Sequence, residues 1–310
     1  MSKTIIVTGG AGFIGSHVTD RLLSAGHAVH VIDDLSTGRE SNLSDGAVLH
    51  RLDIRSGEAA GLIGEIRPDC LVHLAAQIDV RRSLREPGHD ASVNTIGGLN
   101  VVEAAVRSGV RQVVFASSAA TYGSPTVFPT PEEFAGRPVS PYGISKLSFE
   151  HYLNLFRELH GIRVAILRFA NVYGPRQTVR GEAGVVANFI RKMMRGESPT
   201  VNGDGGQTRD YVFVTDVAEM VGRAVERELD GTFNVSTGRE TSVNDLVESL
   251  AEINGREAGV VHGPEVAKED RRSCLDPARA REVAGWEAVV PVGEGLRLTF
   301  EAAKDDPDFV

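Results

Sequence analysis

The sequence predicts an α/β protein, with a doubly wound parallel sheet followed by a smaller C-terminal α/β domain. Three observations support this fold class. Apolar, β-branched runs alternate with amphipathic stretches along the first half of the chain. These runs are continuously apolar, which indicates strands buried on both faces of a parallel sheet. After Gly174 the composition shifts toward Gly, Pro and Arg, which indicates a second unit.

The expected strands of the first sheet are five apolar runs, at 4–8, 28–32, 70–75, 112–117 and 164–169. Helical patterns lie between them, for example over 13–26 and 94–109, and each of these two ends on a glycine. A strand, a crossover helix and a parallel strand form a βαβ unit. A series of such units builds a doubly wound sheet.

The second half of the chain has shorter elements. Helical patterns occur at about 214–226 and 243–254, and a strand-like run at 231–236 is able to return to the first sheet. We therefore expect a first domain over 1–174 and a second over 175–310.

Composition excludes several classes of protein. Two cysteines are too few for a disulfide framework or a thiolate zinc site, and the nine scattered histidines suggest no metal. A net charge of -9 argues against a nucleic-acid surface. The chain passes directly into an apolar β-type run and has no stretch of about 18 apolar residues. We expect a cytoplasmic protein without a membrane partner.

A glycine motif follows the first expected strand. The stretch "TGGAGFIGS" places Gly9, Gly12 and Gly15 at the start of a helix. Glycine allows the backbone to turn tightly and to approach a pyrophosphate, and a helix N-terminus offers free N–H groups. Such a pattern also occurs as a plain tight turn. Its strand–turn–helix context indicates the dinucleotide-binding (Rossmann) form of the fold.

Two acidic residues bear on the identity of the cofactor. Asp33 ends the second expected strand, where a carboxylate accepts hydrogen bonds from the adenosine ribose hydroxyls and repels a 2′-phosphate. This favours NAD over NADP. Asp53 ends a further expected strand in "RLDIR", between the runs at 28–32 and 70–75, where it either contacts the adenine or caps the following helix.

Tyr142 and Lys146 are four residues apart in "YGISK", so they share one face of a helix. An ammonium beside a phenol stabilises the phenolate, and we expect a lowered tyrosine pKa. Such a tyrosine takes a proton from a sugar hydroxyl near neutral pH. The alternative is a helix start with one exposed tyrosine and one exposed lysine.

Seven motifs carry a family resemblance: "TGGAGFIG", "HLAA", "SSAATYG", "YGISK", "RFANVYGPRQ", "TRDYVFVTD" and "LDPARA". Their order resembles that of the extended short-chain dehydrogenase/reductases. Among these, the chain is most similar to the UDP-glucose (UDP-galactose) 4-epimerase family, over nearly its whole length.

The resemblance implies roles for individual residues. Tyr142 is the acid/base, Lys146 holds the nicotinamide ribose, and Ser118 hydrogen-bonds the reacting hydroxyl. Ser117 and Tyr122 are expected to be structural or to lie at the cofactor edge. Asn94 matches an interior asparagine that orders the cofactor. The full set of implied NAD contacts is Gly9, Gly12, Phe13, Ile14, Gly15, Asp33, Asp53, Ile54, Leu74, Ala75, Ala76, Asn94, Tyr142, Lys146 and Phe169.

The resemblance also implies substrate contacts. Asn171 matches a residue that contacts the diphosphate, and Arg209 matches an arginine that pairs with it, which suits the guanidinium group. From the residues alone, a surface salt bridge between Arg209 and Asp210 is the alternative. Glu269 matches a ribose contact. The implied substrate contacts are Ser118, Tyr142, Asn171, Val201, Arg209 and Glu269.

Three departures from the family pattern bear on the substrate. Val266 stands where many relatives have a second phosphate-binding arginine, which weakens the assignment of UDP. Ser273 replaces a bulky tyrosine of some relatives, so an N-acetylated sugar is able to fit. Thr178 stands where uronate epimerases have arginine, which favours a neutral hexose.

Ala119 and Ala120 separate related reactions. By the resemblance, 4,6-dehydratases place acidic residues here, and decarboxylases a glutamate. Alanine neither donates nor accepts a proton. The resemblance therefore favours a UDP-sugar 4-epimerase acting through a transient 4-keto sugar, on UDP-glucose and UDP-galactose.

Two alternatives stay open, and an assembly is expected. The protein could be another nucleotide-sugar enzyme (a dehydratase, decarboxylase or reductase), or a non-catalytic NAD-binding regulatory module. The resemblance implies a homodimer formed through helices near 90–107 and 141–160.

Overall fold

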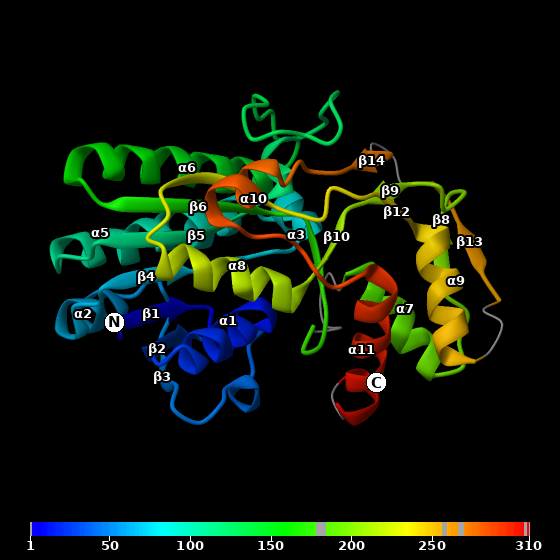
Figure 1. Ribbon diagram of the computed structural model, residues 1–310, viewed down its shortest axis with the longest axis horizontal. Coiled ribbons are helices and arrows are strands. Elements are labelled where there is room, and N and C mark those ends of the chain that lie inside the picture. The colour runs from blue at the N-terminus through cyan, green and yellow to red at the C-terminus, as the bar shows by residue number, and fades with distance from the viewer. Residues whose placement is uncertain (1, 178–183, 256–258, 266–269, 307–308, 310) are drawn as a thin grey trace.

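The computed structural model describes residues 2–177, 184–255, 259–265, 270–306 and 309. A seven-stranded sheet, whose paired strands all run parallel, forms its larger part (Figure 1). The strand order is β11-β6-β5-β4-β1-β2-β3. The strands span Thr4–Thr8 (β1), Ala28–Asp33 (β2), Val48–Arg51 (β3), Cys70–His73 (β4), Gln112–Ser118 (β5), Arg163–Phe169 (β6) and Gly231–Val235 (β11). The predicted fold class is confirmed.

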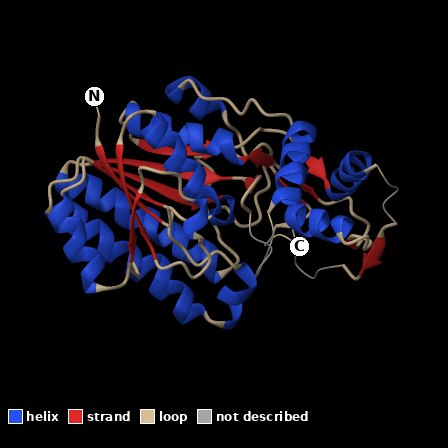
Figure 2. Ribbon diagram, turned by 90° about the horizontal axis from the view of Figure 1, so that it is seen from below, coloured by secondary structure: helices blue, strands red, loops and turns tan. Residues whose placement is uncertain are grey.

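Helices cover both faces of this sheet, as Figure 2 shows. One face packs against α1 (Phe13–Ser24), α8 (Val214–Glu226) and α10 (Ala278–Ala284). The other packs against α2 (Gly57–Ile66), α5 (Gly98–Arg107) and α6 (Pro141–His160). Successive strand residues point to opposite faces, so each continuous apolar run contributes side chains to the cores on both faces of the sheet.

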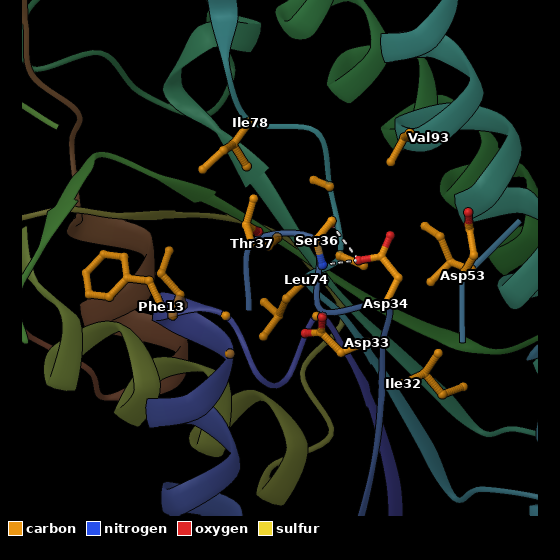
Figure 3. A pocket seen from close by; sticks show the side chains of 18 of the residues that line it. Phe13, Ile32, Asp33, Asp34, Ser36, Thr37, Asp53, Leu74, Ile78 and Val93 are labelled. Atoms are coloured by element: carbon orange, nitrogen blue, oxygen red, sulfur yellow. Dashed lines mark hydrogen bonds between the residues drawn. The ribbon is translucent and has the colours of Figure 1, made fainter. Parts of the chain in front are cut away.

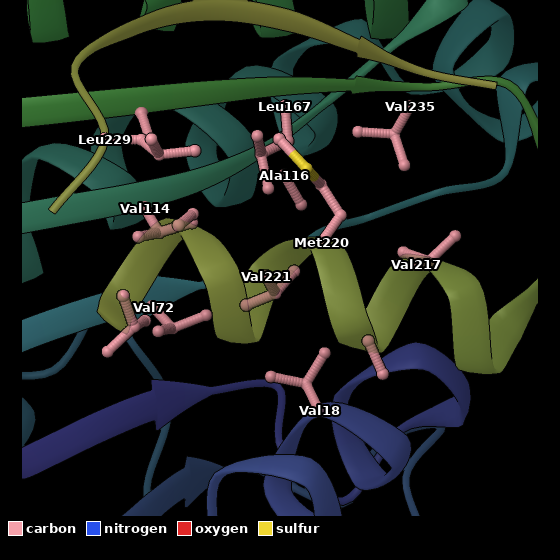
Figure 4. Packing of buried hydrophobic residues seen from close by; sticks show 14 of the residues in the cluster. Val18, Val72, Val114, Ala116, Leu167, Val217, Met220, Val221, Leu229 and Val235 are labelled. Carbon is pink, nitrogen blue, oxygen red and sulfur yellow. The ribbon is translucent and has the colours of Figure 1, made fainter. Parts of the chain in front are cut away.

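The core between the sheet and α8 shows how closely these layers pack. In Figure 4, Met220 and Val221 of α8 lie among side chains of the central strands, including Val114 and Leu167. All four residues are at most 1% exposed.

Short helical segments connect β4 to α5 and β5 to α6. After β4 the chain forms α3 (Val80–Arg85), α4 (Pro87–Ala91) and the π-helical turn η2 (Ser92–Gly97), which leads directly into α5. The predicted helix over 94–109 therefore begins earlier. A single 3-10 turn, η3 (Ala119–Thr121), follows β5, and another, η1 (Glu40–Asn42), follows β2.

The smaller unit has its own core. The helices α7 (Val185–Met194), α9 (Val243–Asn254) and α11 (Val292–Asp305) pack there with β7, β8 and β10. Its strands are Asn171–Tyr173 (β7), Thr200–Asn202 (β8), Thr208–Arg209 (β9), Tyr211–Phe213 (β10), Thr241–Ser242 (β12), Val261–Gly263 (β13) and Arg272–Ser273 (β14). The predicted domain boundary after residue 174 stays a prediction.

The strand-like run at 231–236 corresponds to β11, which pairs in parallel with β6 at the edge of the large sheet. Phe233 of β11 is fully buried in the same core as α8, and the Arg279 guanidinium lies 5.5 Å from its ring centroid. The segment between β7 and β11 therefore leaves the sheet and comes back to it.

Because Phe233 is buried in the main core, Phe233→Ala should lower the free energy of unfolding by about 3–5 kcal/mol. Urea unfolding measures this. Val289→Ala, at a position that is 75% exposed, is the control and should change little. A comparable small effect for both variants would show that β11 adds little to the core.

Candidate active site

The predicted cofactor residues converge at the carboxyl edge of the parallel sheet. All of them except Asn94 line one pocket there, as does Ser117. Further lining residues, which sequence reasoning did not single out, are Ile32, Asp34, Ser36, Thr37, Leu52, Arg55, Ile78, Val93 and Ala116. Figure 3 shows Phe13, Asp33, Asp53 and Leu74 around this pocket. In parallel sheets, ligands bind outside the carboxyl ends of the strands.

The glycine loop between β1 and α1 has no room for side chains. Gly9 has a φ of +72°, and a Cβ atom there would lie 2.7 Å from the amide nitrogen of Ala75. A Cβ atom on Gly15 would lie 1.9 Å from the carbonyl oxygen of Gly9. The helix α1 starts at Phe13, and its N-cap residue Gly12 provides no side-chain cap. Its N-terminus therefore remains available for an anion, which fits a pyrophosphate.

Asp33 is held by the backbone at the end of β2. Its Oδ2 atom accepts a hydrogen bond from the Ala11 N–H at 3.0 Å, and Oδ1 accepts one from the Leu35 N–H at 2.9 Å. Burial raises the pKa of this carboxyl, and the two backbone bonds oppose that shift. Each carboxylate oxygen has a further lone pair, and Asp33 lines the pocket, which fits hydrogen bonds from two ribose hydroxyls.

Asp53 lines the same pocket but does not cap a helix. Ser56 is the N-cap of α2 and accepts from the Ala59 N–H at 3.1 Å, so the capping alternative is wrong. Asp53 instead pairs with Arg55, whose Nη2 lies 2.5 Å from Oδ2. This pairing lowers the pKa of Asp53.

Asn94 lies behind the pocket wall and is 2% exposed. Its Oδ1 accepts from the Gln77 N–H at 2.8 Å, and its Nδ2 donates to the Gln77 carbonyl at 2.9 Å and to Asp90 Oδ1 at 3.1 Å. Its neighbour Val93 lines the pocket instead. The expected interior position of Asn94 is therefore present, and its contact with the cofactor stays a prediction.

The helix α6 carries the Tyr–Lys pair into the pocket. Ser140 caps it by accepting from the Gly143 N–H at 3.1 Å, and Pro141 occupies the first turn. Tyr142 and Lys146 are one turn apart and both line the pocket, although Lys146 is only 3% exposed. The alternative of an exposed pair at a helix start is excluded.

The electrostatics of this pair differ from the expected direction. Burial raises the pKa of Tyr142 to about 12, and a hydrogen bond with Ser118 opposes the rise. The Lys146 ammonium donates to the Ala116 carbonyl at 2.8 Å, and its Nζ lies 5.9 Å from the Tyr142 ring centroid. Burial lowers the pKa of Lys146 to about 8. Without a bound cation, the phenol keeps its proton at neutral pH.

The serines and the tyrosine of "SSAATYG" have separate environments. Ser118 interacts with Tyr142 and accepts from the Ala120 N–H at 3.2 Å. Ser117 donates to buried Glu150. Tyr122 is 1% exposed, and its hydroxyl donates to Asn234 Oδ1 at 2.7 Å. Tyr122 therefore links this loop to β11 as part of the scaffold.

Sequence reasoning missed the ion pair between Glu150 and Arg168. Glu150 lies one turn after Lys146 on α6, and Arg168 lies near the end of β6. Their Oε2 and Nη2 atoms are 2.7 Å apart, and both side chains are buried. The available signal was an arginine inside the apolar run "VAILRF".

Two predicted substrate residues, Asn171 and Arg209, lie on short strands of the smaller unit. Arg209 on β9 is the register partner of Ser273 on β14, and the Asn171 N–H donates to the Asp210 carbonyl at 2.9 Å. The Asp210 carboxylate is buried and accepts from Thr237 and other groups at 238, 274 and 275. An Arg209–Asp210 salt bridge is therefore not formed.

The other substrate predictions have different outcomes. Val201 is 1% exposed and packs in the core of the smaller unit, so any contact it makes with substrate would have to come from its backbone. Glu269 lies outside the described residues, as do Val266 and Thr178. The contacts of Asn171 and Arg209 with substrate stay predictions.

The glycine geometry gives a direct test of the cofactor site. Gly15→Ala should lose bound NAD, because its Cβ atom would collide with backbone of the loop. Gly61→Ala is the matched control, since a Cβ atom at that position on α2 meets nothing within 4 Å. NAD content is measured by absorbance after denaturation of the purified proteins. Equal NAD content in the two variants would contradict the site.

Comparison with known proteins identifies the family. A model of the NAD dependent epimerase/dehydratase family matches residues 5–236. The UDP-glucose 4-epimerase of Mycolicibacterium smegmatis is 45% identical over 303 residues, covering 96% of this chain and 97% of that protein. A more distant relative, UDP-glucuronic acid decarboxylase 1 of Xenopus tropicalis, is 32% identical and covers 96% of this chain and 71% of its own length.

Two solved structures are also similar over nearly the full chain. UDP-glucose 4-epimerase of Thermotoga maritima with UDP-glucose has a TM-score of 0.94 and 44% identity, covering 97% of this chain and 99% of that one. The UDP-glucose 4-epimerase of Thermus thermophilus in complex with NAD has a TM-score of 0.91 and 40% identity, covering 96% and 98%. This chain belongs to the NAD dependent epimerase/dehydratase family of extended short-chain dehydrogenase/reductases, and its cofactor is NAD.

Proposed function

We propose that this protein is a UDP-glucose 4-epimerase that interconverts UDP-glucose and UDP-galactose. The observation that carries the proposal is the joint placement of Tyr142, Lys146 and Ser118 beside a dinucleotide pocket. The next two residues after Ser118 are alanines in η3, so these two positions supply no further acid or base. Such a site suits reversible proton transfer at one hydroxyl.

In the proposed reaction, Tyr142 takes the proton from the 4′-hydroxyl of the sugar and later returns it. Ser118 orients that hydroxyl, and the Lys146 ammonium holds the nicotinamide ribose and stabilises the phenolate. When bound, NAD supplies the hydride acceptor and donor for C4′ and a positive charge that lowers the pKa of Tyr142. The hydride returns to the opposite face of C4′ and Tyr142 returns the proton to its oxygen, so the configuration inverts without net oxidation.

We propose that residues of the smaller unit bind the substrate. Arg209 and Asn171 are assigned to the diphosphate, because a guanidinium group and an amide both donate to phosphate oxygens. Because Ser273, the register partner of Arg209, has a small side chain, we propose that an N-acetylated sugar is also accepted. We assign the protein to the cytoplasm. In the part of the chain that the structure describes, no helix is both long enough and apolar enough to span a membrane.

The first experiment is a panel of UDP- and dTDP-sugars followed by NMR. UDP-galactose should become UDP-glucose without added cofactor and without net NADH. Accumulation of a 4-keto-6-deoxy sugar would instead indicate a dehydratase. Bound NAD without any turnover across the panel would indicate a regulatory module.

The two tyrosines give a matched pair of variants. Tyr142→Phe should abolish epimerisation while NAD stays bound, because the proton relay loses its hydroxyl. Tyr122→Phe should keep the activity but lower the free energy of unfolding by about 1–3 kcal/mol, since Asn234 loses a buried donor. Activity assays and urea unfolding measure both effects. Loss of activity in the folded Tyr122 variant alone would reverse the two roles.

We also propose a homodimer. Large apolar side chains on one side of α6 are exposed, at Ile144 (53%), Tyr152 (42%), Leu155 (50%) and Leu159 (67%). Their spacings are multiples of three and four residues, so they form one stripe along the helix. Ile96, just before α5, is also 60% exposed. An apolar stripe of this kind suits an interface between two copies of the chain.

Leu155→Glu combined with Leu159→Glu should therefore yield a monomer, because two charges would be buried in the interface. Light scattering after size exclusion measures the mass. The control is Val283→Glu combined with Val289→Glu, two positions that are 53% and 75% exposed and lie away from α6. A wild-type monomer would rule the dimer out.

A further inference from the structure

Asp90 is a buried carboxylate on α4 that the proposed reaction does not use. It is 1% exposed. Its Oδ1 accepts from Gln77 Nε2 at 2.9 Å and from Asn94 Nδ2 at 3.1 Å. Its Oδ2 is buried and has no hydrogen-bond partner among the described residues. Both donors are neutral amides, so the negative charge of Asp90 is not neutralised within this network. A buried charge of this kind is costly unless an opposite charge lies nearby.

The network that holds Asp90 leads to the catalytic helix. Asn94 Nδ2 also lies 3.3 Å from Ser145 Oγ. The Ser145 hydroxyl in turn donates to the Tyr142 carbonyl at 2.9 Å. The helices α4 and α6 pack against each other. Asp90 is therefore anchored beside the turn of α6 that separates Tyr142 from Lys146.

The other charged groups near Lys146 are already paired or neutral. Glu150 on α6 is bound by Arg168 of β6. His73 on β4 is uncharged, because burial lowers its pKa to about 3. The segments η2, η3 and β5 contain no charged side chain. On α5, Glu103 pairs with Arg107 at the surface.

The remaining charged or titratable groups on neighbouring segments are Asp79 and Glu86 at the N-caps of α3 and α4, the arginines of α3 at 81, 82 and 85, and His89 of α4. The Asp79 carboxylate accepts from the Arg82 N–H at 2.6 Å. Arg82 is bound to exposed Glu86, and the other two arginines are exposed. Asp90 therefore remains as the carboxylate without a cationic partner. Its charge raises the pKa of both Lys146 and Tyr142, in each case as a smaller effect than burial.

We propose that Asp90 is a positioning residue whose buried charge keeps Lys146 an ammonium ion beside Tyr142. The inference rests on the proposed roles of Tyr142 and Lys146. Burial alone drives a lysine toward its neutral form, and a neutral amine no longer stabilises the phenolate. An unpaired carboxylate behind the site offsets that tendency without occupying the pocket.

The test is the pH dependence of kcat/KM in Asp90→Asn, which removes the charge and keeps the shape. Activity requires protonated Lys146, so it falls as pH rises through the pKa of that group. Loss of the negative charge lowers this pKa, and the alkaline limb should move to lower pH by about one unit. Lower activity with an unmoved limb would show a merely structural role and overturn the proposal.

Two control variants isolate the charge. Glu86→Gln removes a carboxylate four residues earlier, at an exposed position, and should leave the limb unmoved. Asp90→Glu keeps the charge and should keep the wild-type limb. A shift in both Glu86→Gln and Asp90→Asn would indicate a general charge effect and contradict the specific role of Asp90.

A second readout does not depend on activity. Below its folded pKa of about 8, Lys146 is charged in both folded and unfolded protein, so the counter-charge supports folding there. Near pH 10, Lys146 is neutral in the folded protein, and the Asp90 charge then adds nothing to the stability of the fold. The loss of Tm caused by Asp90→Asn should therefore be greatest at pH 7 and shrink toward pH 10. A pH-independent loss would overturn the proposal.

A double variant covers the case in which Asp90→Asn alone is too unstable to study. In a Lys146→Met background, Asp90→Asn should no longer lower the Tm, because no cation remains to be compensated. A loss of Tm that persists in that background would contradict the proposal. If the wild-type protein epimerises no sugar, yet Asp90→Asn shows the pH-dependent loss of Tm, the proposed function is refuted and the role of Asp90 stands.

Discussion

The site is organised around one buried positive charge at the carboxyl edge of the sheet. Lys146 reaches the end of β5 and donates to the Ala116 carbonyl. The sheet can hold an ammonium ion there only if its surroundings offset the cost of removing it from water. The Ala116 carbonyl of β5 and the carboxylates of Asp90 on α4 and Glu150 on α6 offset this cost. The positions of α4, α6 and β6 are therefore coupled to the charge of a single side chain.

The two halves of the active site are built differently. The cofactor side depends on the shape of the backbone. Its glycines have no room for side chains, and Asp33 is held in place by backbone N–H groups. On the substrate side, Asp210 joins segments distant in sequence, because its carboxylate binds the turn at 237–238 while its backbone meets Asn171 and Ser273.

Much of this could be predicted from the sequence, because the signals are local. The glycine spacing, Asp33 and the Tyr142–Lys146 pair lie within single elements, where spacing determines which residues share a face. The role of Asp53 could not be predicted, since it depends on whether Arg55 or a helix terminus is nearer. The Glu150–Arg168 pair and the Asp90 network join different elements. The direction of the Tyr142 pKa was predicted wrongly for the free protein, because burial outweighs the lysine four residues away.

The return of β11 to the large sheet has a consequence for the chain as a folding unit. A protein ending at residue 174 would keep the nucleotide motifs but would leave β6 with a row of unpaired N–H and C=O groups, and would lose α8 from one face of the sheet. Such a fragment would expose both an unpaired edge strand, which is prone to pair with other chains, and an uncovered apolar surface. The core of the smaller unit is built from two stretches of the chain, 173–213 before β11 and 243–309 after it, so the two units cannot be separated by one cut in the chain.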